Sequence, residues 1–238
     1  MLEGENPTLW SFIIHCLHHH IVLQMTRLYV SALSLMGLIL LAESCSSVKT
    51  TQQPSPADLV DVQSINPRIR IELRYATPYN FTKRQLYASG KRCFLRRSAA
   101  EKLDKVQKDL ELLGLGLKIY DGYRPLSVQK AMWAVVPDER YVANPAKGSR
   151  HNRGAAVDIT LVRSDGSEVE MPTPFDDFTE KAHLNYTNLP DSVRRNRDLL
   201  VSMMEKHGFK SLPTEWWHFD ELGWEQYEIL DIDTMYKQ

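Results

Sequence analysis

The chain has 238 residues, and 29 Lys and Arg against 30 Asp and Glu give it a formal net charge of −1. Hydrophobic residues make up 43% and charged residues 25%, which excludes a disordered, collagen-like or coiled-coil chain. This near-neutral charge gives no support for a nucleic-acid partner, which needs a basic surface. Three cysteines are too few for a disulfide framework.

An apolar run lies close to the N-terminus, from Leu28 to Ala42, with Arg27 before it and small residues after it. The run is shorter than the roughly 20 residues that span a bilayer. A positive flank, a short apolar stretch and small residues are typical of a secretory signal. We therefore expect residues 1–45 to be a leader and the protein to be exported. Met25 is a better start than Met1, which would leave 1–24 untranslated.

Cys45 follows the apolar run at the place where bacterial lipoprotein signals carry their lipidated cysteine. Ala42 and Glu43 depart from that pattern, and the alternative is cleavage nearby with loss of Cys45. We expect Cys45 to be a lipid anchor and residues 46–56, rich in Ser, Thr, Gln and Pro, to be a flexible tether. The protein would then lie in the periplasm or on a membrane of a bacterium, touching the membrane only through this anchor.

The folded domain is expected over 57–238. Alternating apolar and charged residues over 69–75 predict a half-buried strand. Ser98 and Glu101 have the spacing of a capping box, and apolar residues at helical spacing follow. They predict a helix over 99–113, ended by Gly114 in the left-handed conformation.

The rest of the domain alternates between further strands, helices and turns. Strands are predicted over 115–120, 155–162 and 216–220, helices over 127–136 and 191–207, a turn over 121–125, a loop over 144–148, and a hairpin turn over 164–167 leading into 168–171. This mixture with hairpin-like connections predicts the α+β class. We expect one domain with a small, mostly antiparallel sheet flanked by helices, and a site on loops and strand ends.

His151 and Asp158 form the first chemically informative stretch. They are separated by an odd number of positions, so a straight strand would point them to opposite faces, unless Gly154 bends the chain between them. Asp158 stands between Val157 and Ile159 in an apolar strand. A carboxylate buried there costs several kcal/mol unless it is paired or binds a metal. The alternative is a structural aspartate that caps a turn or pairs with an arginine.

Glu215 and His218 form the second stretch, and the helical H-E-x-x-H signature of metalloproteases is absent. Their spacing of three also predicts opposite faces of a strand. We therefore expect Glu215 in a turn set by Pro213, with His218 in the strand. The alternatives are a packed core histidine and a solvated glutamate. Two histidines and a carboxylate suit catalytic zinc, and a further carboxylate can act as its general base.

The motifs Ser149-x-His151-x-x-Gly154-x-Ala156-x-Asp158 and Glu215-x-Trp217-His218 resemble those of the zinc peptidase family of D-alanyl-D-alanine dipeptidases and D,D-carboxypeptidases. Asp121-Gly-Tyr-Arg-Pro125 and the WWH form of the second motif look most similar to the vancomycin-resistance-type dipeptidase branch. Three further segments also resemble that branch: 74–77, 80–82 and 171–178. The resemblance covers roughly 65–220 in the same order.

The resemblance implies one Zn²⁺ per chain, held by His151, Asp158 and His218. Glu215 would be the general base that activates the zinc-bound water and then protonates the leaving amine. Arg124 would polarise the scissile carbonyl and stabilise the oxyanion, because a guanidinium stays charged and presents fixed donors. Residues 57–238 would then be a zinc D,D-dipeptidase domain that hydrolyses D-alanyl-D-alanine to two D-alanines.

The resemblance also implies residues that position this small dipeptide. Ser149 and Tyr75 would hold it, although simple core packing is the alternative for Tyr75. Asp176, or its neighbour Asp177, would receive the free amino terminus. Asp121 would either bond its own backbone in a turn or orient a ligand or an arginine.

Two other functions stay open at this point. A D,D-carboxypeptidase or murein endopeptidase would cleave longer stem peptides and would need an open groove around Asp176. A non-catalytic cell-wall-binding lipoprotein would need no base, so Glu215 argues against it. Export favours recycling of the dipeptide over antibiotic resistance, because depletion of a cytoplasmic precursor requires a cytoplasmic enzyme.

Overall fold

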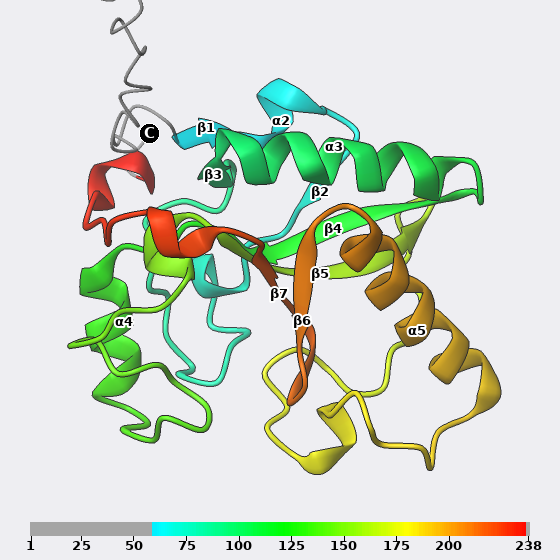
Figure 1. Ribbon diagram of the computed structural model, residues 1–238. Coiled ribbons are helices and arrows are strands. Elements are labelled where there is room, and N and C mark those ends of the chain that lie inside the picture. The colour runs from blue at the N-terminus through cyan, green and yellow to red at the C-terminus, as the bar shows by residue number, and fades with distance from the viewer. Residues whose placement is uncertain (1–58, 237–238) are drawn as a thin grey trace, which may run out of the picture. The chain divides into compact units, whose positions relative to one another are not determined.

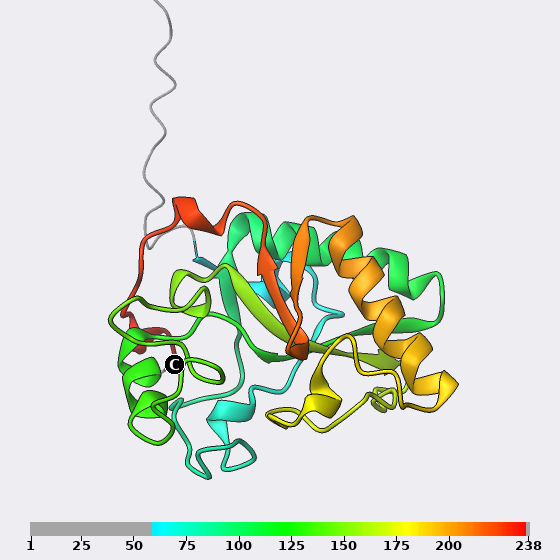
Figure 2. The ribbon, with the colours of Figure 1, turned by 60° about the horizontal axis from the view of Figure 1, so that its bottom comes forward.

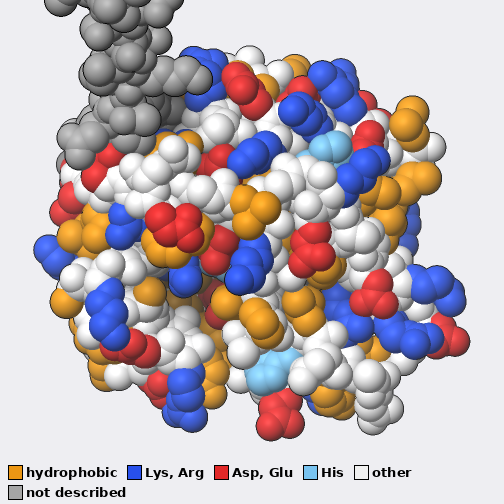
Figure 3. Space-filling model, viewed as in Figure 1, with side chains coloured by type: hydrophobic (Ala, Val, Ile, Leu, Met, Phe, Trp, Pro, Cys, Tyr) orange, Lys and Arg blue, Asp and Glu red, His pale blue; other side chains and the backbone are white. Residues whose placement is uncertain are grey.

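The computed structural model describes residues 59–236 (Figure 1). The expected leader (1–45), the tether (46–56) and the anchor Cys45 lie outside the described residues. Within residues 59–236, no helix is long and apolar enough to cross a membrane. Figure 3 shows Lys and Arg side chains interspersed with Asp and Glu on one face, so no single sign of charge dominates there.

A five-stranded sheet forms the centre of the described fold, with the order β2-β4-β5-β7-β6. Its strands are β2 (Arg70–Ile71), β4 (Leu115–Asp121), β5 (Ala156–Arg163), β7 (Glu215–Glu221) and β6 (Phe209–Leu212). Neighbours pair antiparallel except β2 and β4, which are parallel. A small second sheet pairs β1 (Leu59–Asp61) with β3 (Phe94–Arg96). The predicted α+β class and mostly antiparallel sheet are confirmed.

Two long helices, α3 (Arg97–Glu111) and α5 (Asp191–Lys206), pack against the sheet and against each other (Figures 1 and 2). The shorter α2 (Val62–Ile65) contacts α3, and α4 (Leu126–Trp133) lies away from both long helices. Short 3-10 helices occupy Arg74–Ala76, His151–Arg153, Glu180–Ala182, Trp224–Gln226 and Asp233–Tyr236.

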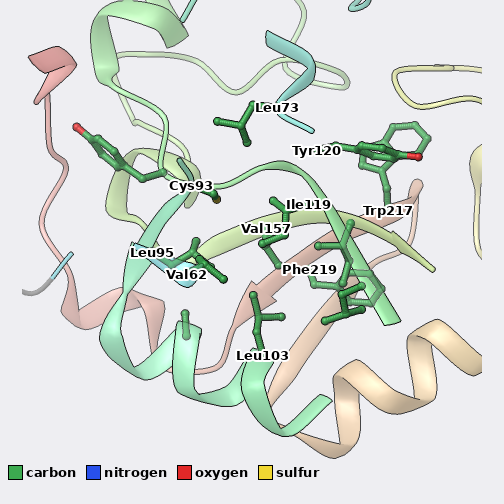
Figure 4. Packing of buried hydrophobic residues seen from close by; sticks show 14 of the residues in the cluster. Val62, Leu73, Cys93, Leu95, Leu103, Ile119, Tyr120, Val157, Trp217 and Phe219 are labelled. Atoms are coloured by element: carbon green, nitrogen blue, oxygen red, sulfur yellow. The ribbon is translucent and has the colours of Figure 1, made fainter. Parts of the chain in front are cut away.

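One layer of the hydrophobic core lies between the sheet and the long helices, and buried aromatic residues such as Tyr120 and Trp217 lie on the other face of the sheet (Figure 4). Leu103 of α3 packs near Val157 of β5 and Phe219 of β7 (Figure 4), and all three side chains are fully buried. Successive residues of a strand point to opposite faces. Because Val157 and Ile159 face this core, Asp158 between them must face the other side of the sheet. The alternation of β5 therefore directs the carboxylate away from the layer that the long helices cover.

The predicted strand over 69–75 is wrong in length, although its alternation of burial is right. Leu73 and Tyr75 are buried and Glu72 is exposed, but only Arg70 and Ile71 pair with β4. The chain then tightens into a 3-10 turn, in which Ala76 N donates to Leu73 O. An extended chain that lies over a core shows alternating burial whether or not it is a strand. A strand requires, in addition, hydrogen bonds to a neighbouring strand.

The predicted capping box is also wrong. Helix α3 begins at Arg97, so Ser98 lies inside its first turn. The Ser98 hydroxyl bonds the Tyr227 hydroxyl at 2.7 Å instead of a backbone N–H. The helix ends at Glu111, and Gly114 adopts the predicted left-handed conformation with φ +71°.

The other predicted elements agree with the structure to within a few residues. Helix α4 ends three residues earlier than predicted, and 168–171 contributes only an isolated bridge between Val162 and Glu168. Cys93 is fully buried with a free thiol.

Gly154 allows a test of the turn that leads into β5. Its φ is +69°, and an added Cβ would lie 2.5 Å from Leu59 Cδ2. Gly114 has a similar φ, with nothing within 4 Å of an added Cβ. We expect Gly114→Ala to lower the free energy of unfolding by about 1 kcal/mol through backbone strain alone. Gly154→Ala should lower it by about 2 kcal/mol or more, because the added Cβ would displace the Leu59 side chain and would also lie 3.3 Å from the main-chain N of Arg96.

Urea unfolding of the two variants beside the wild type measures the difference. Equal losses would show that the close approach of Leu59 to Gly154 does not constrain this turn.

Candidate active site

A cavity of about 250 Å³ lies on the face of the sheet opposite the long helices, at the ends of β5 and β7. It contains every residue to which the sequence assigned a catalytic, metal-binding or substrate-binding role. These residues are Tyr75, Arg124, Ser149, His151, Asp158, Asp176, Glu215 and His218. Residues from five separate parts of the chain therefore converge on one small space.

His151, Asp158 and His218 meet because of a turn and a strand register. His151 lies in a 3-10 turn that ends at Gly154 in the left-handed conformation, and this turn reverses the chain into β5. Asp158 of β5 lies directly opposite His218 of β7 in the antiparallel pair. The predicted bend at Gly154 thus solves the problem of the odd spacing between His151 and Asp158.

The distances among these three residues fit a zinc ion. Asp158 Oδ1 lies 3.0 Å from His218 Nδ1 and 3.4 Å from His151 Nε2, and the two nitrogens lie 3.2 Å apart. Ligand atoms about 2.0–2.1 Å from a tetrahedral zinc lie about 3.3–3.4 Å from one another. Two imidazoles and one carboxylate are also a ligand set that catalytic zinc uses. The residues therefore fit Zn²⁺ without rearrangement of the chain.

Hydrogen bonds determine which nitrogen each histidine can offer to a metal. His151 Nδ1 lies 2.8 Å from the carbonyl oxygen of Gly122. A carbonyl only accepts, so Nδ1 carries the hydrogen and Nε2 is left with its lone pair. His218 Nε2 lies 2.9 Å from Asp220 Oδ1, which leaves His218 Nδ1 to face the centre. Each lone pair points to the space between the three ligands.

Arg124 is held rigidly at the edge of this centre. Its Nη2 and Nε donate to Asp121 Oδ2 at 2.7 and 3.0 Å, and Nη1 donates to Gln129 Oε1 at 2.8 Å. Its guanidinium lies over the Tyr75 ring, 5.1 Å from the centroid. Burial lowers the pKa of Arg124, but Asp121 outweighs burial, and the group stays charged. The Nη2 is still 4.0 Å from Asp158 Oδ2, so this arginine does not neutralise the ligand carboxylate through a close ion pair.

Asp121 is a supporting residue of the site, and the interpretation as a self-bonded turn former is wrong. It is fully buried, accepts two bonds from Arg124, and accepts a third from the Tyr87 hydroxyl at 2.6 Å. Three hydrogen bonds offset much of the cost of burying its charge.

Glu215 is the first residue of β7, so the predicted turn at this position is wrong. The pairing of β6 with β7 shifts here, because Ser211 is opposite Phe219 while Leu212 is opposite Glu215. The extra residues of β7 break the strict alternation of faces. Glu215 and His218 consequently line the same cavity despite their odd spacing. Burial is the main cause that raises the pKa of Glu215 to about 7.

Asp176 and Tyr75 form another side of the cavity. The Tyr75 hydroxyl donates to Asp176 Oδ1 at 3.0 Å, and Phe81 N donates to Oδ2 at 3.1 Å. Burial raises the pKa of Asp176 to about 7. Asp177 instead accepts from Thr179 N at 2.9 Å and lies outside the residues that line the cavity. The geometry therefore favours Asp176 as the carboxylate that faces a ligand.

Ser149 is buried in the cavity wall, and its main-chain N donates to Asn152 Oδ1 at 2.7 Å.

Sequence reasoning missed Asp220 and Gln129. Asp220 had a signal, because it follows His218 by two positions in a strand and so shares its face. Gln129 had no such signal, since its contact with Arg124 depends on how α4 packs.

Carboxyl groups outnumber fixed positive charges in this buried region. Burial raises the pKa of Asp158, but the neighbouring histidines outweigh it and hold the pKa well below its usual range. Burial lowers the pKa of His218, but hydrogen bonds to Asp158 and Asp220 raise it to about 10. In the absence of metal a proton on His218 thus balances the carboxylates. A divalent cation placed between the ligands would balance them instead.

Comparison with known proteins supports the resemblance to the D-alanyl-D-alanine dipeptidase family. A family model described as D-ala-D-ala dipeptidase matches residues 55–233. A D-alanyl-D-alanine dipeptidase of Escherichia coli (strain K12) is 39% identical over 163 residues, 68% of this chain and 84% of that protein. One of Enterococcus faecalis is 32% identical over 171 residues, 63% of this chain and 85% of that protein.

A solved structure of the vancomycin-resistance D,D-dipeptidase VanXYg with a D-Ala-D-Ala phosphinate analogue aligns at 19% identity and a TM-score of 0.37. The alignment covers 55% of this chain and 51% of that one, which is too weak a similarity to locate site residues. The extent of the family match and the identity to the curated relatives are sufficient: the chain belongs to the D-Ala-D-Ala dipeptidase family of peptidases.

Proposed function

We propose that this protein is a zinc dipeptidase that hydrolyses D-alanyl-D-alanine to two D-alanines. The observation that carries the proposal is the triple of His151, Asp158 and His218 at 3.0–3.4 Å from one another. Glu215 and Arg124 line the same cavity, in a chain that belongs to the D-Ala-D-Ala dipeptidase family.

The side chains around the metal site divide the chemistry of peptide hydrolysis among them. When bound, Zn²⁺ supplies a Lewis acid and lowers the pKa of water. Glu215 accepts the proton of the attacking water and delivers it to the leaving amine. A carboxyl group with a pKa raised toward neutrality suits both transfers. Arg124 donates to the carbonyl oxygen as negative charge develops there, and Asp121 and Gln129 keep it in place.

The rest of the cavity suits a short zwitterionic substrate. Asp176, supported by the Tyr75 hydroxyl, receives the ammonium group of the dipeptide, and Ser149 helps to position the substrate. The volume of about 250 Å³ is below the roughly 300–1,000 Å³ of pockets for drug-sized ligands. A buried carboxylate at the amino end penalises peptides that lack a free amine there. This favours a dipeptide over the longer stem peptides of a D,D-carboxypeptidase or endopeptidase.

The N-terminal segment adds a proposal about location. Export and a lipid anchor at Cys45 rest on the apolar run from Leu28 to Ala42 and the cysteine after it. Recycling of the dipeptide outside the cytoplasm is the matching role. Mass spectrometry of the N-terminal peptide from the membrane fraction tests the anchor, and an unmodified Cys45 would contradict it.

Substrate choice is the direct test of the function. We expect the purified zinc-loaded protein to cleave D-Ala-D-Ala at least 100-fold faster, in kcat/KM, than a stem pentapeptide ending in D-Ala-D-Ala. Release of D-alanine, measured with both substrates at equal enzyme concentration, provides the comparison. Preferential cleavage of the pentapeptide would reverse the assignment to a carboxypeptidase, and cleavage of neither would favour a binding protein.

Zinc content tests the ligand set. We expect the wild type to bind about one zinc per chain, and His218→Ala to lose most of it, because catalytic zinc needs all three protein ligands. His183 is partly buried outside the cavity, so His183→Ala is a matched control. Elemental analysis after dialysis measures both, and full zinc in His218→Ala would contradict the proposed site.

Glu215→Gln tests the general base while keeping the shape of the side chain. We expect normal zinc content and a fall in kcat of about 10²–10⁴-fold. The pKa of Glu215 is about 7 without metal against an ordinary 4.5, and a bound cation favours the carboxylate. The wild-type kcat/KM should therefore fall as the pH drops from about 7 toward 4.5, because protonated Glu215 accepts no proton. A Glu215→Gln variant that keeps the wild-type rate and the same acid limb would exclude this role.

A further inference from the structure

We propose that Asp220 is a positioning residue for the metal centre, with Arg150 as its support. It orients the His218 ring and selects the tautomer in which Nδ1 is free to bind the metal. This inference rests on the proposed zinc site, and it concerns residues outside the ligand set.

Strand geometry places Asp220 beside His218. Asp220 lies two residues further along β7, so both side chains project from the same face. Asp220 Oδ1 is 2.9 Å from His218 Nε2, while His218 Nδ1 on the opposite side of the ring is 3.0 Å from Asp158 Oδ1. The imidazole is thus held between two carboxylates, one at each nitrogen.

A histidine without this contact would be a poor ligand in this geometry. The neutral ring has two tautomers, and only the one with its hydrogen on Nε2 leaves Nδ1 able to bind a metal. A half turn of the ring would also replace Nδ1 with a carbon atom. The Asp220 carboxylate accepts the Nε2 hydrogen, which stabilises the useful tautomer and the useful orientation together.

Arg150 connects this support to the other histidine. Its Nε lies 3.6 Å from Asp220 Oδ2, and its guanidinium lies over the Trp224 ring, 4.8 Å from the centroid. Arg150 directly precedes His151 in the chain. The ion pair therefore joins the two segments that carry His151 and His218, on the outer side of the site. The positive charge of Arg150 also favours the ionised form of Asp220, which only accepts hydrogen bonds.

The structure shows two different supports for the two histidines. His151 Nδ1 donates to a main-chain carbonyl, that of Gly122, which no side-chain substitution removes. His218 depends on a side chain, which makes its support open to mutation. Asp220 is mostly buried, with 8% of its surface exposed, so water replaces its hydrogen bond poorly.

Zinc affinity measured by competition with a chelating dye tests the proposal on the full chain. We expect Asp220→Ala to weaken zinc binding by about 10–100-fold, the usual effect of removing such a partner. Asp220→Asn keeps an oxygen acceptor for Nε2, but a neutral and weaker one, so it should weaken zinc binding by about three- to fivefold, less than Asp220→Ala. Asp198→Asn, which alters an exposed carboxylate paired with Arg197, should bind zinc as tightly as the wild type.

Nitrogen-15 chemical shifts of His218 provide a readout that a purely structural role would not move. In the zinc-loaded wild type and in zinc-loaded Asp220→Asn the Nε2–H of His218 should show the nitrogen shift and slow hydrogen exchange of a hydrogen-bonded group, and in zinc-loaded Asp220→Ala the same N–H should exchange faster. Unchanged zinc affinity in a folded Asp220→Ala variant would overturn the proposal. If that variant does not fold, wild-type affinity in Asp220→Asn would overturn it.

These measurements separate the inference from the proposed function. A protein that binds zinc in an Asp220-dependent manner but cleaves no dipeptide would refute the function and leave the inference standing. Unchanged zinc affinity in Asp220→Ala, together with full dipeptidase activity of the wild type, would refute the inference and leave the function standing.

Discussion

The antiparallel pairing of β5 with β7 is the constraint on which the site depends. It places Asp158 directly opposite His218, so that two ligands from distant parts of the chain become cross-strand neighbours. A shift of one residue would turn one of these side chains into the hydrophobic core. Val157 and Phe219, paired in the same register and fully buried, resist such a shift. The packing of the core thereby specifies the geometry of the polar site on the other face.

Two local irregularities complete what the register begins. The left-handed Gly154 turns His151 toward Asp158, and the pairing shift between β6 and β7 brings Glu215 to the face of His218. Regular strands would have separated both pairs, because their spacings are odd. The bulge and the turn are therefore the features that convert ordinary strand ends into a site that fits a metal and a base.

The sequence predicts the kinds of residue in the site better than their supports. Two histidines, an aspartate within an apolar strand and a nearby glutamate are residue types that suit zinc hydrolysis, and they can be recognised from their order along the chain. The contacts of Asp121 with Tyr87 and of Arg124 with Gln129 depend on packing between separate elements, which residue spacing does not encode. The predictions of a strand over 69–75 and of a capping box failed for a similar reason. The length of the strand depends on pairing with β4, and the Ser98 hydroxyl bonds Tyr227 from a distant part of the chain.

The cost of the site to stability follows from its charges. Asp121, Asp158 and Asp220 are buried, and each needs a partner to avoid a penalty of several kcal/mol. Asp121 has Arg124 and Asp220 has His218 and Arg150, while Asp158 meets only the two histidines closely. In the metal-free protein the histidines compensate the charge of the ligand carboxylate and hold its pKa low, which requires a proton on His218. A bound cation would replace this proton, so metal affinity and fold stability depend on the same buried charges.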